Sequence, residues 1–226
     1  VEFGDNDVFY LGVSGVRSLR ARDSSNAAFV GDIGNPIDET VIAEIRNNED
    51  NGEEAQGILD PRTGRYLLAI GSTVFVFSYF PSSKVSAWST YEPGFVIDRW
   101  AYDGEQVLCR SGDSLFSLGG KLGNTFDSST VEVQMPFLDA GRPADSKDLT
   151  GIDVTCTNQW DISVATDPTD ITAIQNIATV TRTTYGLGRA TMTGYSTHIA
   201  PKITCTKAGE ARLGNIALHY EGAESG

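Results

Sequence analysis

The sequence has few of the residues that carry most enzyme chemistry. It contains only two histidines, three cysteines and two methionines. His198 and His219 both fall in segments typical of strands, without a nucleophile elbow, so the pattern does not favour a serine or cysteine hydrolase. Cys109, Cys156 and Cys205 are widely spaced and form no C-x-x-C motif, which argues against a zinc site or a disulfide framework. We expect buried, inert thiols, no catalytic residue, no metal and no cofactor.

Basic residues are also scarce. The chain has 17 Lys and Arg against 30 Asp and Glu, for a formal net charge of −13. Such a chain gains little affinity from neutralising phosphates and is repelled by anionic membranes. It has no apolar run long enough to span a bilayer and no pattern of an N-terminal signal peptide. The composition suits a protein made in a reducing cytoplasm, without a membrane-spanning segment.

Strands separated by turns dominate the first half of the chain. Six short apolar segments, beginning with "RYLLAI" and ending with "SLFSL", are joined by turns of two to four residues. This hairpin meander predicts an all-β fold with propeller-like sheets over 1–118, in three groups: an N-terminal hairpin, 58–91 and 95–118. Closed propellers have at least four blades, so other sequence or neighbouring chains must supply the rest. The chain starts with Val1, almost inside a strand, and we expect it to be the C-terminal part of a longer protein.

One short helix is predicted near 35–46, in "NPIDETVIAEIR". Asn35 suits the N-cap and the following proline suits the first helical position. Ile37, Val41 and Ile45 are spaced to share one face, which predicts the side that packs on the core.

A second all-β region follows a Gly/Ser-rich stretch. Residues 119–129, "GGKLGNTFDSS", predict a linker. Beyond it, seven segments enriched in Thr, Val and Ile predict a β-sandwich over 130–222.

The segment "RSLRARDSSNAAF" places arginines in an otherwise acidic chain. In a strand, Arg20 and Arg22 share one face and Arg17 lies on the other, so no single broad basic face forms. Asp23 and Asn26 then belong to a polar strand exit. We interpret these five residues as framework or subunit-interface residues, with arginines that pair with carboxylates. Contact with nucleic acid is the alternative.

Three longer stretches resemble a known family. These are "GVRSLRARDSSNAAFVGDIGNPID", "GRYLLAIGSTVFVFSYFPSSKVSAWSTY" and "YGLGRATMTGYSTHIAPKITCTKAGEARLGNIALHYE". Together they resemble the C-terminal portion of the tail nozzle proteins of short-tailed bacteriophages, a group also called tail tubular protein B, or the tail hub that stabilises packaged DNA. The likeness covers most of the chain and consists of structural motifs in a common order.

The resemblance implies a virion structural protein of the phage tail, made in the host bacterial cytoplasm, with no enzymatic turnover. Identical subunits would form a ring, a hexamer in this family, next to the tail adaptor and portal proteins. DNA would pass through the ring during ejection without sequence-specific binding.

Two other functions are left open by the residues. Propellers and sandwiches both bind sugars, so a receptor- or glycan-binding module of a virion is the alternative, with Trp100 and Trp160 as aromatic platforms. A glycoside hydrolase would need two carboxylates across a groove, and acidic residues are too numerous here for a pair to be assigned.

Overall fold

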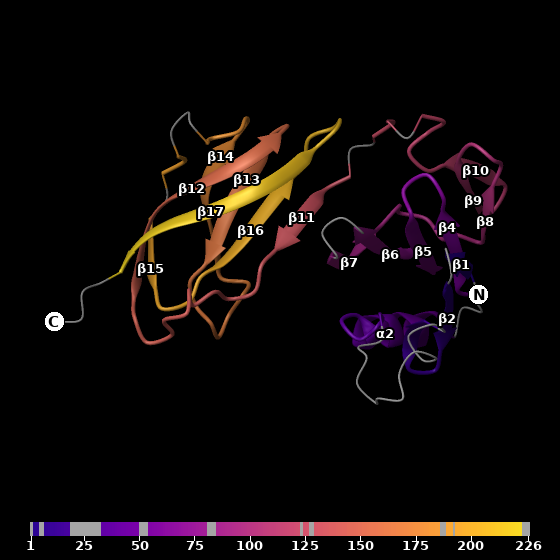
Figure 1. The fold of residues 1–226 in the computed structure, drawn as a ribbon, viewed down its shortest axis with the longest axis horizontal. Coiled ribbons are helices and arrows are strands. Elements are labelled where there is room, and N and C mark those ends of the chain that lie inside the picture. Colours follow the sequence, from indigo (N-terminus) through magenta and orange to yellow (C-terminus); the bar gives the residue numbers. More distant parts are fainter. Residues whose placement is uncertain are drawn as a thin grey trace. The chain divides into compact units, whose positions relative to one another are not determined.

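The computed structural model describes residues 2–4, 7–18, 33–49, 54–80, 85–122, 124–126, 129–185, 189–191 and 193–222 (Figure 1). Within them the predicted all-β class with one short helix is confirmed, since antiparallel strands dominate and one short helix is present. The chain divides into two compact units, Val1–Asn124 and Thr125–Gly226, called unit 1 and unit 2 below. The division falls within the Gly/Ser-rich stretch 119–129.

Unit 1 contains three antiparallel sheets, each a meander of consecutive strands. The first sheet comprises β1 (Glu2–Gly4), β2 (Asp7–Gly12) and β3 (Gly15–Ser18). The second comprises β4 (Gln56–Asp60), β5 (Arg65–Ile70), β6 (Thr73–Phe80) and β7 (Val85–Tyr91). The third comprises β8 (Arg99–Tyr102), β9 (Val107–Ser111) and β10 (Ser114–Ser117). The grouping of strands matches the three groups predicted from the turns.

The β4–β7 sheet is buried on both faces. Successive β5 residues from Tyr66 to Ile70 are all at most 2% exposed, which requires apolar partners on each side of the sheet. On one side Leu67 and Ala69 join a core with residues of the β8–β10 sheet. On the other, Tyr66 and Leu68 join a core with the first sheet and the helix. The sheets of unit 1 therefore pack face to face in sequence order.

The helix α2 (Asp38–Glu49) begins three residues after the predicted N-cap, Asn35. The preceding residues form a turn instead, in which the Ile37 amide donates to the Gly34 carbonyl at 2.8 Å. The predicted apolar face is confirmed, because Ile37, Val41 and Ile45 all pack in the core next to the β4–β7 sheet, with Val41 fully buried. The helix starts later than predicted, since the Val41 amide donates to the Ile37 carbonyl at 2.9 Å and Asp38 is the first helical residue.

Unit 2 consists of two antiparallel sheets that share one core, a sandwich-like arrangement. One sheet has the order β11 (Val131–Gln134), β16 (Ala200–Cys205), β13 (Trp160–Ala165) and β14 (Ile174–Val180). The other has the order β15 (Gly194–Ser196), β12 (Lys147–Thr157) and β17 (Arg212–Gly222). Buried residues of both sheets, such as Ile152 and Ile203 at 0% exposure, form the core between them.

One strand of unit 2 lies later than the sequence predicts. Of the seven segments, "GRATMTG" (188–194) is predicted as a strand, but the strand β15 starts only at its last residue, Gly194. Ala190 instead forms an isolated antiparallel bridge with Ile152 of β12. Two backbone hydrogen bonds, of 2.8 and 2.9 Å, join Ala190 and Ile152, so Ala190 pairs with β12 without belonging to a strand.

Candidate functional site

Arg17 joins the first sheet of unit 1 to the start of the helix. Its guanidinium donates to both carboxylate oxygens of Asp38, Nη1 to Oδ1 at 2.8 Å and Nη2 to Oδ2 at 2.9 Å. The same group also donates to the carbonyls of Val16 and Ser14 at 2.8 and 2.5 Å. The Arg17 and Asp38 side chains are only 13% and 18% exposed, so the bidentate pair is largely shielded from water.

Two glycines make room for this contact. A Cβ at Gly34 would lie 2.2 Å from the Val16 carbonyl oxygen, and one at Gly15 would lie 1.9 Å from Oδ1 of Asp38. Gly15 also has a φ of 115°, a conformation that side chains rarely adopt. Arg17 thus belongs to a tightly packed framework contact, which we call the Arg17–Asp38 clamp. The other residues of this predicted set, Arg20, Arg22, Asp23 and Asn26, lie outside the described residues.

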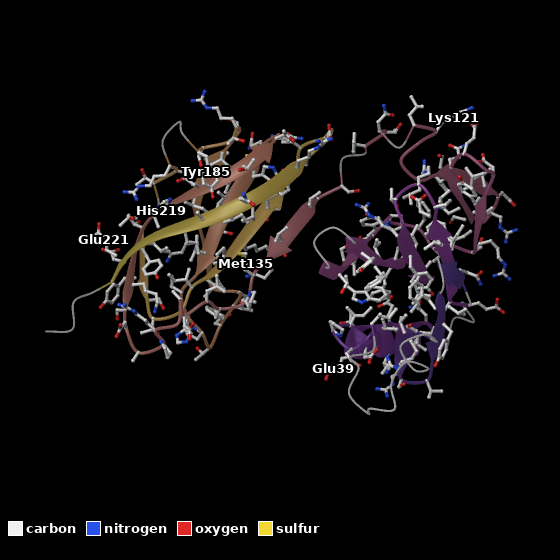
Figure 2. All side chains as sticks on the ribbon, in the orientation of Figure 1. Glu39, Lys121, Met135, Tyr185, His219 and Glu221 are labelled. Carbon is white, nitrogen blue, oxygen red and sulfur yellow. The ribbon has the colours of Figure 1, made fainter. Side chains whose placement is uncertain are left out.

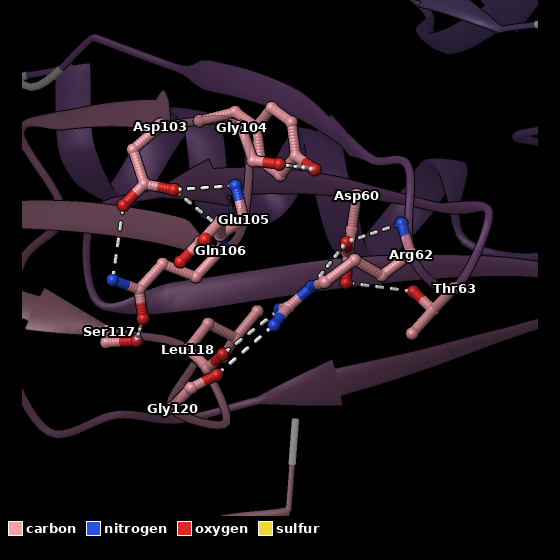
Figure 3. Close-up of polar contacts among 11 residues, drawn as sticks. Asp60, Arg62, Thr63, Asp103, Gly104, Glu105, Gln106, Ser117, Leu118 and Gly120 are labelled. Carbon is pink, nitrogen blue, oxygen red and sulfur yellow. Dashed lines mark hydrogen bonds and ion pairs between the residues drawn. The ribbon is translucent and has the colours of Figure 1, made fainter. Parts of the chain in front are cut away.

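A second arginine contact links the turn between β4 and β5 to the chain after β10 (Figure 3). Asp60 is 4% exposed, and its Oδ1 accepts from the backbone amide and Nε of Arg62 at 3.0 and 3.2 Å. The two outer nitrogens of Arg62 donate to the carbonyls of Leu118 and Gly120, both at 3.2 Å. Thr63 donates its hydroxyl to the other oxygen of Asp60 at 3.0 Å. The buried carboxylate thereby holds Arg62 between two sheets.

The turn between β8 and β9 is organised by Asp103 (Figure 3). Its Oδ1 accepts from the amides of Glu105 and Gln106, both at 2.8 Å, and these bonds lower the pKa of the Asp103 carboxyl. Gln106 donates its side-chain amide to the other oxygen of Asp103 at 3.2 Å and accepts from Ser117 Oγ at 2.7 Å. The polar contacts of this turn therefore extend to β10 and serve the framework of the third sheet.

A Thr–Asp–His arrangement lies on the outer side of the β15–β12–β17 sheet. Asp153 accepts from Thr184 Oγ1 at 2.7 Å, and its other oxygen lies 2.8 Å from Nε2 of His219. The Thr184 bond is the main cause that lowers the pKa of Asp153, followed by His219 and, more weakly, Arg189, and partial burial opposes them. In a catalytic triad the hydroxyl contacts the imidazole, which in turn contacts the carboxylate. Here the Thr184 hydroxyl contacts the carboxylate of Asp153, so the three residues do not have the order of a triad. The arrangement connects two strands and a loop.

His198 and the three cysteines lack the surroundings of reactive groups. His198 Nδ1 lies 2.9 Å from the hydroxyl of the adjacent Thr197. The predicted burial of the thiols is confirmed, since Cys109, Cys156 and Cys205 are free and at most 6% exposed. Burial raises the pKa of Cys109 and of Cys156, which disfavours the nucleophilic thiolate.

The two tryptophans expected as sugar platforms are not exposed rings. Trp160 is 1% exposed in the core of unit 2, and its Nε1 donates to the Thr157 carbonyl at 2.9 Å. Trp100 is half-buried, packs against the core between the second and third sheets, and donates to the Gln56 carbonyl at 3.2 Å. Trp160 as a platform was wrong, because a strand begins at this residue with its side chain turned inward.

Unit 2 contains an apolar groove of about 480 Å³ between the segment after β11 and the strand β17. The residues that line it include Phe137, Leu138, Ile216, Leu218 and Lys147. Lys147 is 2% exposed, and its ammonium donates to the carbonyls of Arg142, Asp145 and Thr197 at 2.7 to 2.8 Å. All three ammonium protons are used, so this cation has none left to orient a ligand.

Within the described ranges, His, Cys, Asp and Glu side chains form no group of three or more that could hold a metal ion. No helix within those ranges is long and apolar enough to cross a membrane. Comparison with known proteins finds no family model and no curated protein that matches this sequence.

Proposed function

We propose that the chain is a structural subunit of a bacteriophage tail, in which identical copies form the ring of a nozzle around the DNA ejection channel. The proposal starts from the resemblance of the three stretches quoted above to tail nozzle proteins. The family's ring is a hexamer that contacts adaptor and portal proteins in the virion, and we propose the same for this chain.

The observation that carries the proposal is the double-sided burial of the β4–β7 sheet. The sheets before and after it in sequence cover its two faces, and its first strand, β4, contacts the first strands of both neighbours, β1 and β8. Meander sheets that pack face to face with their first strands adjacent are the arrangement of consecutive propeller blades. This supports a propeller sector in unit 1, as the family requires.

Such a sector needs further sheets to close. The strand β10 is the last of its sheet, and all four of its residues are exposed, including Leu115 at 68%. Leu115 lies opposite Arg110, on the face away from the buried Cys109. We propose that this face packs against another sheet in the assembled ring, because an exposed apolar side chain on an open sheet favours association.

The charge balance is compatible with passage of DNA. With a net charge of −13, the protein offers few cationic groups that could bind the phosphates of DNA. A channel through which DNA slides must not retain it, so an acidic subunit suits the proposed role.

Native mass spectrometry of the purified full-length protein tests the proposal. We expect a closed oligomer of identical copies. Leu115→Lys should reduce the assembled fraction, because it places a charge on the proposed contact face. Val13→Lys is the matched control, since Val13 is fully exposed at a hairpin tip. A protein that stays monomeric at micromolar concentration, or two variants with equal effects, would contradict the proposed assembly.

A further inference from the structure

The strand β17 is an edge strand of unit 2, and its partner β12 shows which of its backbone groups point outward. Within the described residues β17 pairs only with β12. The amide and carbonyl of Ile152 on β12 bond to Ala190, at 2.8 and 2.9 Å. Those of Val154 bond to the hydroxyl and the amide of Thr184, both at 2.9 Å. Both β12 residues therefore direct their backbone groups away from β17.

Leu218 and Ile216 stand opposite these two residues on β17. In an antiparallel pair, opposite residues that exchange no hydrogen bonds direct their N–H and C=O groups outward on both strands. The amides and carbonyls of Ile216 and Leu218 thus point to the open edge of the sheet, and they make no hydrogen bond to another described residue. Backbone groups at this two-residue spacing form the pairing pattern of one further strand.

The edge strand of the other sheet has uncovered apolar side chains on its inner face. Val133 of β11 is opposite Ile203 of β16, which is 0% exposed, so both side chains face the core. Val131 is opposite the buried Cys205 in the same way. Val131 and Val133 are nevertheless 42% and 36% exposed. The sheet of β11 has four described strands and the facing sheet has three, so the core is open where a fourth strand would cover β11.

The apolar groove of about 480 Å³ lies at the same opening. Its lining combines Met135 and Leu138, after β11, with Ile216 and Leu218 of β17. Figure 2 labels Met135 and the β17 residue His219. Because Ile216 and Leu218 contribute both to the groove and to the outward backbone groups, the groove and the open edge are continuous.

We propose that β17 accepts one extended segment of a partner protein as an additional strand. Backbone pairing selects a polypeptide, because a peptide chain presents donors and acceptors at the spacing of Ile216 and Leu218. Alternate side chains of this segment are apolar, since they enter the groove and cover Val131 and Val133. The side chains between them face solvent and are polar.

A partner segment fits this edge better than a second copy of the chain. Every described strand of unit 2 already belongs to a sheet, so a second copy would bring a two-layered sandwich to the edge. The opening is one strand wide, because β11 extends only the opposite layer by one strand. The inference goes beyond the proposed role in a tail and does not depend on it, because it rests only on the residues of unit 2.

Hydrogen exchange measured by NMR, with and without a peptide, tests the proposal. The probe is a peptide of about nine residues in which valine alternates with threonine, with lysine at each end. In the chain alone the amides of Ile216 and Leu218 should exchange fast, and the peptide should slow them about tenfold or more. The amide of Ala217, which alternates with them and points to β12, should be protected in both samples.

A peptide of the same composition with consecutive valines is the control for strand pairing, because it cannot place all of them on one face. In a fluorescence titration it should bind about fivefold or more weakly than the alternating peptide. Equal binding of the two peptides, or binding that leaves Ile216 and Leu218 unprotected, would show that the groove takes apolar groups without strand pairing and would overturn the proposal.

Val133→Lys tests the contribution of the groove side. This variant should weaken binding of the alternating peptide about fivefold or more, because the added strand would bury the ammonium. Val133 is more than a third exposed in the free chain, so the lysine reaches solvent there without unfolding unit 2. Gln134→Lys is the matched control, since it makes the same charge change on the opposite face of β11 and should bind as the original protein does. Equal effects of the two variants would contradict the proposed site.

Exchange in the chain alone distinguishes the other occupants. Protection of Ile216 and Leu218 that disappears on dilution would identify a second copy at this edge. Protection that is independent of concentration would identify a segment of the same chain. Either result would overturn the proposal of a partner segment.

Discussion

At the scale of single residues, the best-developed polar contacts of unit 1 involve arginines that pair with carboxylates and backbone carbonyls. Arg17 binds Asp38, and Arg62 binds Asp60, each within a set of carbonyl contacts. A guanidinium has five donors in a fixed plane, so one side chain can satisfy a carboxylate and several carbonyls together. The chain has few basic residues, and at least two of its arginines stabilise the fold of unit 1 through such contacts.

The Arg17–Asp38 clamp makes a prediction about stability. Arg17→Ala should lower the free energy of unfolding of unit 1 by about 2 kcal/mol, because it leaves a shielded carboxylate and two carbonyls without a donor. Urea unfolding followed by the fluorescence of Trp88, which packs in the adjacent core, measures this.

Arg99→Ala is the control for that measurement. Arg99 pairs with Glu54, but their side chains are 58% and 73% exposed, so the change should cost less than about 0.5 kcal/mol. Equal losses in the two variants would mean that the clamp contributes no more than a surface ion pair.

At the scale of elements, Asp153 connects β12 to β17 and to the loop that contains Thr184. Its pKa is lower in the folded protein than in an unfolded chain, mainly because of the Thr184 hydroxyl. A carboxyl with a lowered pKa stabilises the fold above its unfolded pKa, about 3.9 for aspartate, and this stabilisation is lost as the pH falls through the folded value.

Asp153→Asn should therefore be less stable than the original protein near pH 6, and the difference should shrink below about pH 4. Urea unfolding at a series of pH values measures the two curves. Asp113→Asn, which removes one carboxylate at an exposed turn, is the control for the change in net charge. A constant difference between Asp153→Asn and the original protein from pH 6 to pH 2 would show that the carboxylate contributes packing and no titrating charge.

Local pattern was sufficient to predict most elements of the meander. Gly71, Gly104 and Gly112 stand in turns with φ of 58°, 97° and 55°, which favour glycine, and the apolar segments between such turns are short enough for strands. The helix start was not predictable in this way. Asp38, the first helical residue, contacts Arg17, which lies 21 residues earlier, and no local spacing indicates such a contact.

The candidate sites depend even more on contacts between distant residues. Thr184 and His219 lie 31 and 66 residues from Asp153, so no local spacing indicates that they meet. The buried position of Trp160 was not predictable from the local pattern either, because an aromatic residue at a strand start is compatible with either face of the strand.

At the scale of the whole molecule, the chain combines two compact β units with different uses of their sheets. In unit 1 the β4–β7 sheet is covered on both faces, a property of repeated sheet packing. In unit 2 two sheets share a single core and leave their outer faces to solvent or partners. A packed scaffold with open outer faces suits a subunit of an assembly.

The most direct test of the proposed nozzle role is electron cryo-microscopy of phage particles whose genome encodes this sequence. We predict density for several identical copies of the chain in a ring around the DNA channel of the tail, with the β8–β10 sheet of each copy packed against another sheet. Purified particles that lack this protein, or that carry it outside the tail, would contradict the account.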